Sequence, residues 1–320
     1  MGENTSVNKI GVFFVDFYIL NSYLYIKDYV MAKVLVCCIV RDENQYLREF
    51  VEYYKKIGAE NVIIFDNNVT GGENVEDVIK DYIDNGFVIL KDYKDKRICQ
   101  LQSYQECYDD YGDKYDWICF FDCDEFLTFR NKRMTMPEFF SNKRFDGYDM
   151  IHVNWMLYGD NDLVRNDGRP VLERFKKPMM PFNKKVKYPF PENNHIKAIV
   201  RGGLKGVVWK GVSHTPSEPL TCCDPVGKPC KSTSPFNDYN FSEMWLAHYT
   251  TKTAEEFAYK IKRGFPDTAP GRREEIDMAK RFFKYCKITP EKVEVIKQIT
   301  GIDLNLEGFD CVIFQKSIVD

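Results

Sequence analysis

Alternating strand and helix patterns in the first half of the chain limit the fold most strongly. Val34–Val40 is a continuous apolar run rich in β-branched residues, typical of a parallel strand covered on both faces. Apolar residues then recur at helical spacing from Leu47 to Ile57, and Gly58 follows as a helix end. The same order repeats twice before the apolar run Trp117–Phe121. This alternation predicts an α/β fold with a doubly wound, mostly parallel sheet and helices on both faces.

Polar clusters follow three of the four predicted strands. They are Arg41, Asp42 and Glu43 after the first strand, Asp66 and Asn68 after the second, and Asp122 and Asp124 after the fourth. A helix cap or a solvated turn explains any one of them. Because ligands bind beyond the carboxyl ends of parallel strands, three clusters on one edge indicate a binding site. The chain contains no G-x-G-x-x-G after the first strand and no G-x-x-x-x-G-K-[ST], which disfavours dinucleotide and Walker-type sites.

The segment WICFFDCDEFL, Trp117–Leu127, is the most informative of these strand ends. Its apolar run stops abruptly at Asp122 and Asp124, with Glu125 next in sequence. Two carboxylates two residues apart can both reach one hard cation where the backbone turns. Mg²⁺ and Mn²⁺ prefer oxygen ligands and are commonly completed by substrate phosphates. The segment therefore predicts a metal–diphosphate site.

Composition constrains the partners and the compartment. The 320 residues carry a net charge of −3 with a pI near 5.9, so no basic balance indicates nucleic acid. The eleven cysteines suggest no disulfide framework, which predicts a reducing, cytoplasmic setting. Cys222, Cys223 and Cys230 form one cluster, with His214 as the nearest histidine. Because C-x-x-C is absent, a reduced surface loop is favoured over a zinc site.

The chain is predicted to divide into three parts: an N-terminal extension of residues 1–30, a main domain of residues 31–265 and a helical support of residues 266–320. In the first part Ile10–Ile26 is apolar but contains Asp16, and its length is at the lower limit for a membrane span. We expect a packed or membrane-surface extension, and hence peripheral association with the inner face of a membrane. In the last part Arg272–Cys286 and Pro290–Thr300 are predicted helices.

The second half of the main domain is less regular. A charged, proline-rich segment, Arg165–Asn194, fits either a solvated loop or a flap over an anionic substrate. Thr253 is predicted to cap a helix that reaches Lys262, with Glu256 completing a capping box. Further short strands are predicted at Asp149–Met156, His195–Val200, Gly206–Trp209 and Met244–Ala247, the last of which delivers His248.

Several segments, taken in order, resemble a known family. They are RDENQYLREFVEYYKKIGAENVIIFDNN, FFDCDEFL, NWMLYG and LAHYTTKTAEEFAYKIKRG. Together they are similar to nucleotide-sugar glycosyltransferases of the GT-A type, in the family 2-like and family 92 group. The resemblance extends over roughly Lys33 to Phe265. It implies a nucleotide-sugar donor, with a uridine diphosphate hexose favoured, a Mn²⁺ or Mg²⁺ cofactor, and transfer with inversion to a glycan or glycolipid acceptor.

The resemblance also implies roles for individual residues. Asp122 would face the ribose or the metal, Asp124 and His248 would ligate the metal, and Lys252 would neutralise the diphosphate. The nucleotide pocket would be lined by Arg41, Asp42, Glu43, Asp66, Asn68 and Gln100.

Inversion requires a carboxylate base to accept the proton of the acceptor hydroxyl. The candidates are Asp160, Asp162 and Glu243, with a slight preference for Asp160 because its loop follows NWMLYG.

Two other functions remain open on the sequence. A strand followed by D-x-D also opens the haloacid-dehalogenase phosphatases, although Phe126 stands where that motif normally has threonine or valine. The other alternative is a non-catalytic GT-A fold that binds sugars. The complete acidic triplet and the matching His248 argue against it.

Overall fold

The computed structural model describes residues 31–179, 191–210, 214–217, 219–231, 233–264 and 271–307. The expectations for residues 1–30 therefore lie outside the described residues, as does the part of the charged segment from residue 180 to 190. From Ala32 onward the chain forms one compact unit. Within the described residues, no helix is both long enough and apolar enough to cross a membrane.

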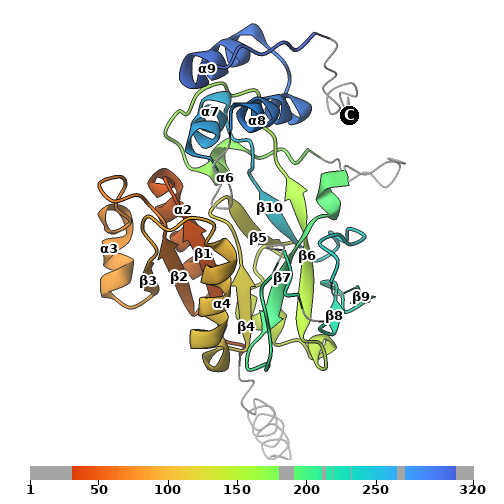
Figure 1. The fold of residues 1–320 in the computed structure, drawn as a ribbon. Coiled ribbons are helices and arrows are strands. Elements are labelled where there is room, and N and C mark those ends of the chain that lie inside the picture. Colours follow the sequence, from red (N-terminus) through yellow and green to blue (C-terminus); the bar gives the residue numbers. More distant parts are fainter. Residues whose placement is uncertain are drawn as a thin grey trace, which may run out of the picture. The chain divides into compact units, whose positions relative to one another are not determined.

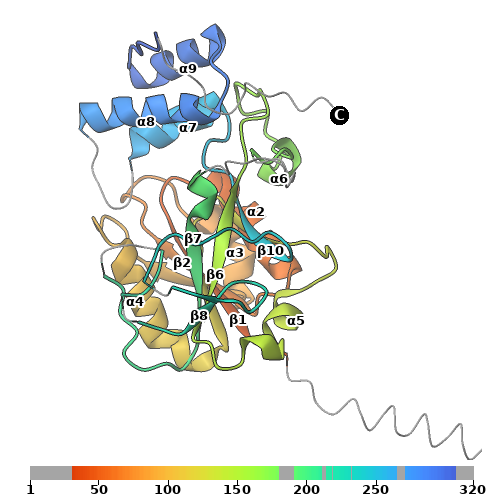
Figure 2. The ribbon, with the colours of Figure 1, turned by 90° about the vertical axis from the view of Figure 1, so that its right-hand side faces the viewer.

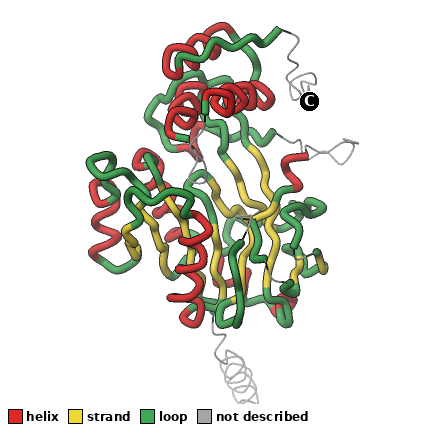
Figure 3. Tube along the Cα trace, viewed as in Figure 1, coloured by secondary structure: helices red, strands yellow, loops and turns green. Residues whose placement is uncertain are grey.

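A single mixed sheet forms the centre of this unit, with the strand order β3-β2-β1-β4-β7-β6-β10-β5 (Figures 1 and 3). β1, β2, β3 and β4 are mutually parallel. β7 runs antiparallel to β4 and β6, and β10 is parallel to β6 but antiparallel to β5. The strands are β1 (Val34–Val40), β2 (Asn61–Asp66), β3 (Val88–Asp92), β4 (Trp117–Phe120), β5 (Glu125–Phe129), β6 (Met150–Leu157), β7 (Ile196–Arg201), β8 (Cys222–Cys223), β9 (Pro229–Cys230) and β10 (Met244–His248).

Helices cover both faces of the sheet, as the alternation predicts. Alternate residues of β1 point to opposite faces, so Val36 packs with α2, α3 and α5, whereas Cys37 packs with α4. The described helices are α2 (Asn44–Lys56), α3 (Glu76–Asp84), α4 (Gln100–Tyr111), α5 (Met136–Phe140), α6 (Val171–Arg174), α7 (Ala254–Arg263), α8 (Arg272–Tyr285) and α9 (Pro290–Thr300), with 3₁₀ turns at Gly112–Lys114, Lys143–Phe145 and Pro191–Asn194.

Helices α7, α8 and α9 stack on one another at one end of the sheet (Figure 2). Phe257 of α7, Phe282 of α8 and Ile296 of α9 share one apolar cluster. The N-terminus of α7 has the predicted capping box: Thr253 accepts from the Glu256 amide, and the Glu256 carboxylate accepts from the Thr253 amide. The two C-terminal helices thus share a core with α7, which follows directly from the sheet strand β10.

The predicted α/β class is confirmed, one local expectation is wrong, and one strand was not predicted. Gly206–Trp209 forms no strand, and its Val207 and Trp209 instead bury their side chains beside α4. Strand β5 was not predicted, because Glu125 at its start marks the end of the preceding apolar run in sequence. Its pairing with β10 sets the geometry described next.

Candidate active site

A tight turn between β4 and β5 brings Asp124 to His248. Glu125, the first residue of β5, is the direct cross-strand partner of His248 at the end of β10. The amide of Tyr249 donates to the Asp124 carbonyl at 2.9 Å. Asp124 Oδ1 consequently lies 3.4 Å from His248 Nε2. Two residues far apart in sequence are thus held side by side by strand pairing.

Two lysines contact the other oxygen of Asp124. Lys260 Nζ on α7 lies 2.9 Å from Asp124 Oδ2, and Lys252 Nζ lies 3.6 Å away. Burial raises the pKa of this carboxyl, but Lys260, Lys252 and His248 outweigh it and hold the pKa well below its usual range. Lys252 has a left-handed backbone (φ 50°), which a non-glycine residue adopts at a cost of about 1–3 kcal/mol. Because its pKa is held low, Asp124 is ionised, although its side chain is only 5% exposed.

His248 is a neutral imidazole in a buried setting. Its ring lies against Trp155, with the ring centroids 4.4 Å apart. Burial lowers the pKa of His248, and the nearby Asp124 opposes that shift only in part. A neutral imidazole keeps a lone pair that can bind a cation.

Asp122 belongs to a second, adjacent cluster. Its Oδ2 accepts from Lys197 Nζ at 3.0 Å, and its Oδ1 accepts from Gln100 at 3.2 Å and Tyr104 at 3.3 Å. The fully buried Glu125 accepts from the Asp122 amide and lies 3.7 Å from Lys197. Burial raises the pKa of Glu125 well above its usual range, which favours the protonated acid.

The predicted metal ligands fit a divalent cation in part. Asp124 Oδ1 and His248 Nε2 are close enough to share one ion, and substrate phosphates could complete the coordination of Mg²⁺ or Mn²⁺. Asp122 does not join them: within the described residues, no ligand cluster containing Asp124 brings three donor atoms within 4.8 Å of one another. The structure therefore offers two protein ligands there rather than three.

A cleft of about 450 Å³ adjoins this cluster. One wall is formed by Asp42 and Glu43 of the β1–α2 loop and Tyr46 of α2, and the other by Lys252 and α7. Its volume lies within the range of about 300–1,000 Å³ that is usual for small-molecule sites.

The polar residues after β1 and β2 largely position these loops. Asn68 Oδ1 accepts from the amide of Asp42, which has a left-handed backbone (φ 49°). Glu43 pairs with Arg263 of α7 at 3.0 Å. Asp66 is buried, accepts from the Asn68 amide and lies 3.5 Å from Lys94. These contacts fix the cleft wall and bury Asp66 and Asn68, although Asn68 Nδ2 has no hydrogen-bond partner among the described residues.

Arg41 lies at the start of the same loop. Its carbonyl accepts from Arg263 at 2.8 Å, and its buried Nε has no hydrogen-bond partner among the described residues.

The three candidate bases have different surroundings. Asp160 is buried in an ion pair with Lys292 of α9, so a proton could reach it only if that contact opened. Glu243 forms an ion pair with Arg144. Because it directly precedes β10, the five extended residues of that strand place it about 16 Å from His248. Asp162 follows β6, which is parallel to β10 and ends beside His248. Its side chain lies 3.9 Å from the same Lys292 but is 70% exposed.

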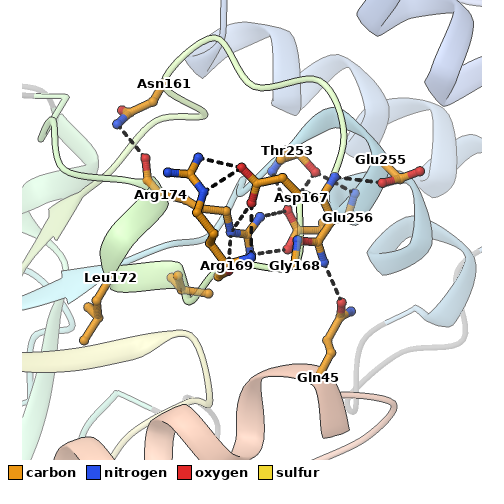
Figure 4. Close-up of polar contacts among 12 residues, drawn as sticks. Gln45, Asn161, Asp167, Gly168, Arg169, Leu172, Arg174, Thr253, Glu255 and Glu256 are labelled. Atoms are coloured by element: carbon orange, nitrogen blue, oxygen red, sulfur yellow. Dashed lines mark hydrogen bonds and ion pairs between the residues drawn. The ribbon is translucent and has the colours of Figure 1, made fainter.

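The charged segment that begins at Arg165 is docked over its described part (Figure 4). Arg174 forms a bidentate ion pair with Glu256, with N–O distances of 2.7 and 2.9 Å. Asn166 contacts Glu255 of α7 and Gln45 of α2. Up to Met179, these contacts attach the segment to α2 and α7.

Comparisons with known proteins identify the family of the chain. The model for glycosyltransferase family 92 matches residues 32–275, which is most of the chain. The chain belongs to glycosyltransferase family 92. A family 92 protein of Ricinus communis is 29% identical over 95 residues, which cover 30% of this chain and 17% of that protein. One from Oryza sativa subsp. japonica is 28% identical over 94 residues, which cover 29% of this chain and 16% of that protein.

Among solved structures, S. aureus TarS is similar in fold. Residues 1–349 of TarS match with a TM-score of 0.37 and 12% identity, covering 84% of this chain and 81% of that one. The same fragment in complex with UDP matches with a TM-score of 0.39 and 10% identity, covering 83% and 80%.

Three cationic residues of this family 92 chain escaped the sequence analysis: Lys197, Lys260 and Arg263. Lys197 lies in a short strand, where a lysine normally indicates a solvated face, and nothing local shows that it is buried. Lys260 and Arg263 did leave a signal, because Glu256, Lys260 and Arg263 are spaced at i, i+4 and i+7 on one face of α7. Extending the capping box along its helix would have found them.

Proposed function

We propose that this chain is a metal-dependent glycosyltransferase that transfers a hexose from a uridine diphosphate donor, with inversion, to a hydroxyl group of a glycan or glycolipid. The observation that carries the proposal is the surplus of positive charge around the acidic turn. Lys197 contacts Asp122, and Lys252 and Lys260 contact Asp124. The third acid of the turn, Glu125, lies 3.7 Å from Lys197, but burial raises its pKa well above the usual range, which favours its neutral form. A buried surplus of cations is costly unless an anion compensates it, and a diphosphate beside the cleft would do so.

We assign separate roles in the transfer to the residues of this site. Lys252 and Lys260 would bind the diphosphate and stabilise the charge that develops on it as its bond to the sugar breaks. Asp124 and His248 would hold the Mn²⁺ or Mg²⁺ ion, which supplies further neutralisation of the leaving group when it is bound. Gln100 and Tyr104, which orient Asp122, would fix that carboxylate toward the donor.

The acceptor proton needs a base on the same edge of the sheet. We favour Asp162 over Asp160 and Glu243, because it is exposed and lies on that edge. Asp162→Asn should lower the transfer rate about 10²–10⁴-fold while leaving donor affinity unchanged. Equal rates for wild type and variant would remove Asp162 from the reaction.

The function is tested by release of nucleoside diphosphate from a panel of nucleotide sugars, with Mn²⁺ and with chelator. We expect metal-dependent turnover of at least one uridine diphosphate hexose, lost in Asp124→Asn. Asp110→Asn is the matched control, because Asp110 pairs with Lys91 on the surface. Folded protein that turns over no donor under either condition would support a binding protein instead. Transient phosphorylation of Asp122 by phosphoryl donors would support a phosphatase.

A further inference from the structure

A second polar cluster lies away from the acidic turn, where the β8–β9 hairpin joins the sheet. β8 pairs in parallel with β6, and Met150 and Cys222 are register partners. His152 is the next residue of β6 on the same face as Met150. Across the hairpin, Cys222 lies directly opposite Cys230. The topology thus collects one imidazole and two thiols from segments about seventy residues apart in sequence.

The three side chains converge. Their ligand atoms, one ring nitrogen and two sulfurs, all lie within 4.8 Å of one another. The two sulfurs are 3.1 Å apart. Cys223, the neighbour of Cys222, points to the opposite face and packs in the other core cluster. His214, the histidine nearest in sequence, instead contacts the Ile196 carbonyl at 2.6 Å and takes no part.

His152 distinguishes a metal site from a pair of thiols. Its side chain is fully buried, and the Cys222 thiol interacts with its ring. Neither ring nitrogen makes a hydrogen bond of regular geometry among the described residues. A buried polar group without a partner costs about 1–3 kcal/mol. A disulfide between Cys222 and Cys230 would leave that cost in place, whereas a metal ion would bind one of the ring nitrogens.

We propose that His152, Cys222 and Cys230 bind a zinc ion that fastens the β8–β9 hairpin to β6. Two sulfurs and one nitrogen suit zinc, whereas Mg²⁺ and Mn²⁺ prefer oxygen. Zinc–sulfur bonds of about 2.3 Å in a tetrahedral site place two sulfurs about 3.8 Å apart, so the thiols need only a small separation. Cys230 is partly exposed, so we expect water to supply the fourth ligand.

The hairpin itself is built to hold this arrangement. Asp224 accepts from the amides of Val226 and Lys228 at 3.0 and 2.9 Å, and Gly227 provides the left-handed turn (φ 83°). Apart from β8 and β9, the described residues between β7 and β10 contain no helix or strand. A metal would therefore add the main cross-link of that long connection.

The test measures zinc per chain in full-length protein purified without chelator. We expect about one zinc ion in the wild type, almost none in Cys230→Ser and His152→Ala, and an unchanged content in Cys223→Ala. Because a variant could fail to fold, the wild type is also stripped with chelator and titrated with Cd²⁺, whose thiolate charge-transfer absorption should saturate at one equivalent. Any of three results would overturn the proposal: no zinc and no Cd²⁺ uptake in the wild type, a Cys222–Cys230 disulfide in the unreduced mass spectrum, or full zinc content in Cys230→Ser. None of these readouts depends on sugar transfer.

Discussion

Helix α7 contacts two buried carboxylates whose surroundings differ. Glu256, in its first turn, is paired through both of its oxygens with Arg174, and Thr253 and Tyr46 supply further hydrogen bonds. Asp124, facing Lys260 one turn later, has two lysines and a neutral histidine around it. The first cluster is balanced and satisfied. The second has more positive charge than its carboxylate can compensate.

We infer from this difference that the first cluster is a structural ion pair and the second a candidate binding site. A balanced, hydrogen-bonded ion pair is not stabilised further by a ligand, so removing it lowers the free energy of unfolding. A cluster with excess positive charge is stabilised when an anion binds, so removing its charged residues lowers the affinity for that anion. We therefore expect changes at Arg174 and Glu256 to act on unfolding, and changes at Lys260 and Asp124 to act on diphosphate binding.

The largest effect is expected at the balanced pair. Arg174→Ala leaves Glu256 charged, buried and unpaired, and should lower the free energy of unfolding by about 3–5 kcal/mol. Denaturant unfolding followed by circular dichroism measures this loss. Arg169→Ala is the matched control: Arg169 is 54% exposed beside Asp167 and should cost less than about 1 kcal/mol. Equal losses in the two variants would mean that burial does not distinguish the pairs.

A smaller effect, on affinity, is expected at the unbalanced cluster. Lys260→Met removes the cation nearest to Asp124 and should weaken binding of uridine diphosphate with Mn²⁺ by roughly ten- to a hundredfold. Isothermal titration calorimetry measures the change. Lys80→Met, which breaks an exposed pair with Asp84 on α3, should leave the affinity unchanged. If Lys260→Met loses stability but no affinity, the second cluster is structural too.

The smallest effect is a dependence of stability on pH. Burial raises the pKa of Glu256, but Arg174, Thr253 and Lys252 outweigh it and hold the pKa below 4.5. A depressed folded-state pKa stabilises the protein above the unfolded value, and this contribution disappears as the pH falls through the folded value. Wild type should thus lose more stability than Glu256→Gln on acidification below about pH 4.5. Parallel melting curves for the two proteins would contradict this.

The sequence predicts the parallel half of the sheet well. Val34–Val40 and Val62–Phe65 are continuous apolar runs, as burial on both faces requires. Thr253 with Glu256 marks a helix start by local chemistry alone. The sequence does not predict strands whose pairing partners are distant along the chain. β5 is stabilised by β10, more than a hundred residues away, and two-residue strands such as β8 have no period to detect.

The candidate site shows the same limit. Asp122, Asp124 and His248 follow apolar runs and could be singled out in sequence, yet the structure separates Asp122 from the other two. The pairing of β5 with β10, which no local pattern indicates, brings His248 to Asp124. Strand pairing also brings His152 to Cys222, although the two lie seventy residues apart.

The central claim is that Asp124 binds a metal for a diphosphate that the neighbouring lysines hold. Calorimetric titration of uridine diphosphate into wild type and Asp124→Asn, each with Mn²⁺ and with chelator, tests it most directly. We predict that Mn²⁺ tightens binding at least tenfold in the wild type and has no effect in Asp124→Asn. The variant should keep its metal-free affinity or improve it, because Lys252 and Lys260 lose their competing carboxylate. An equal Mn²⁺ enhancement in both proteins would contradict the account.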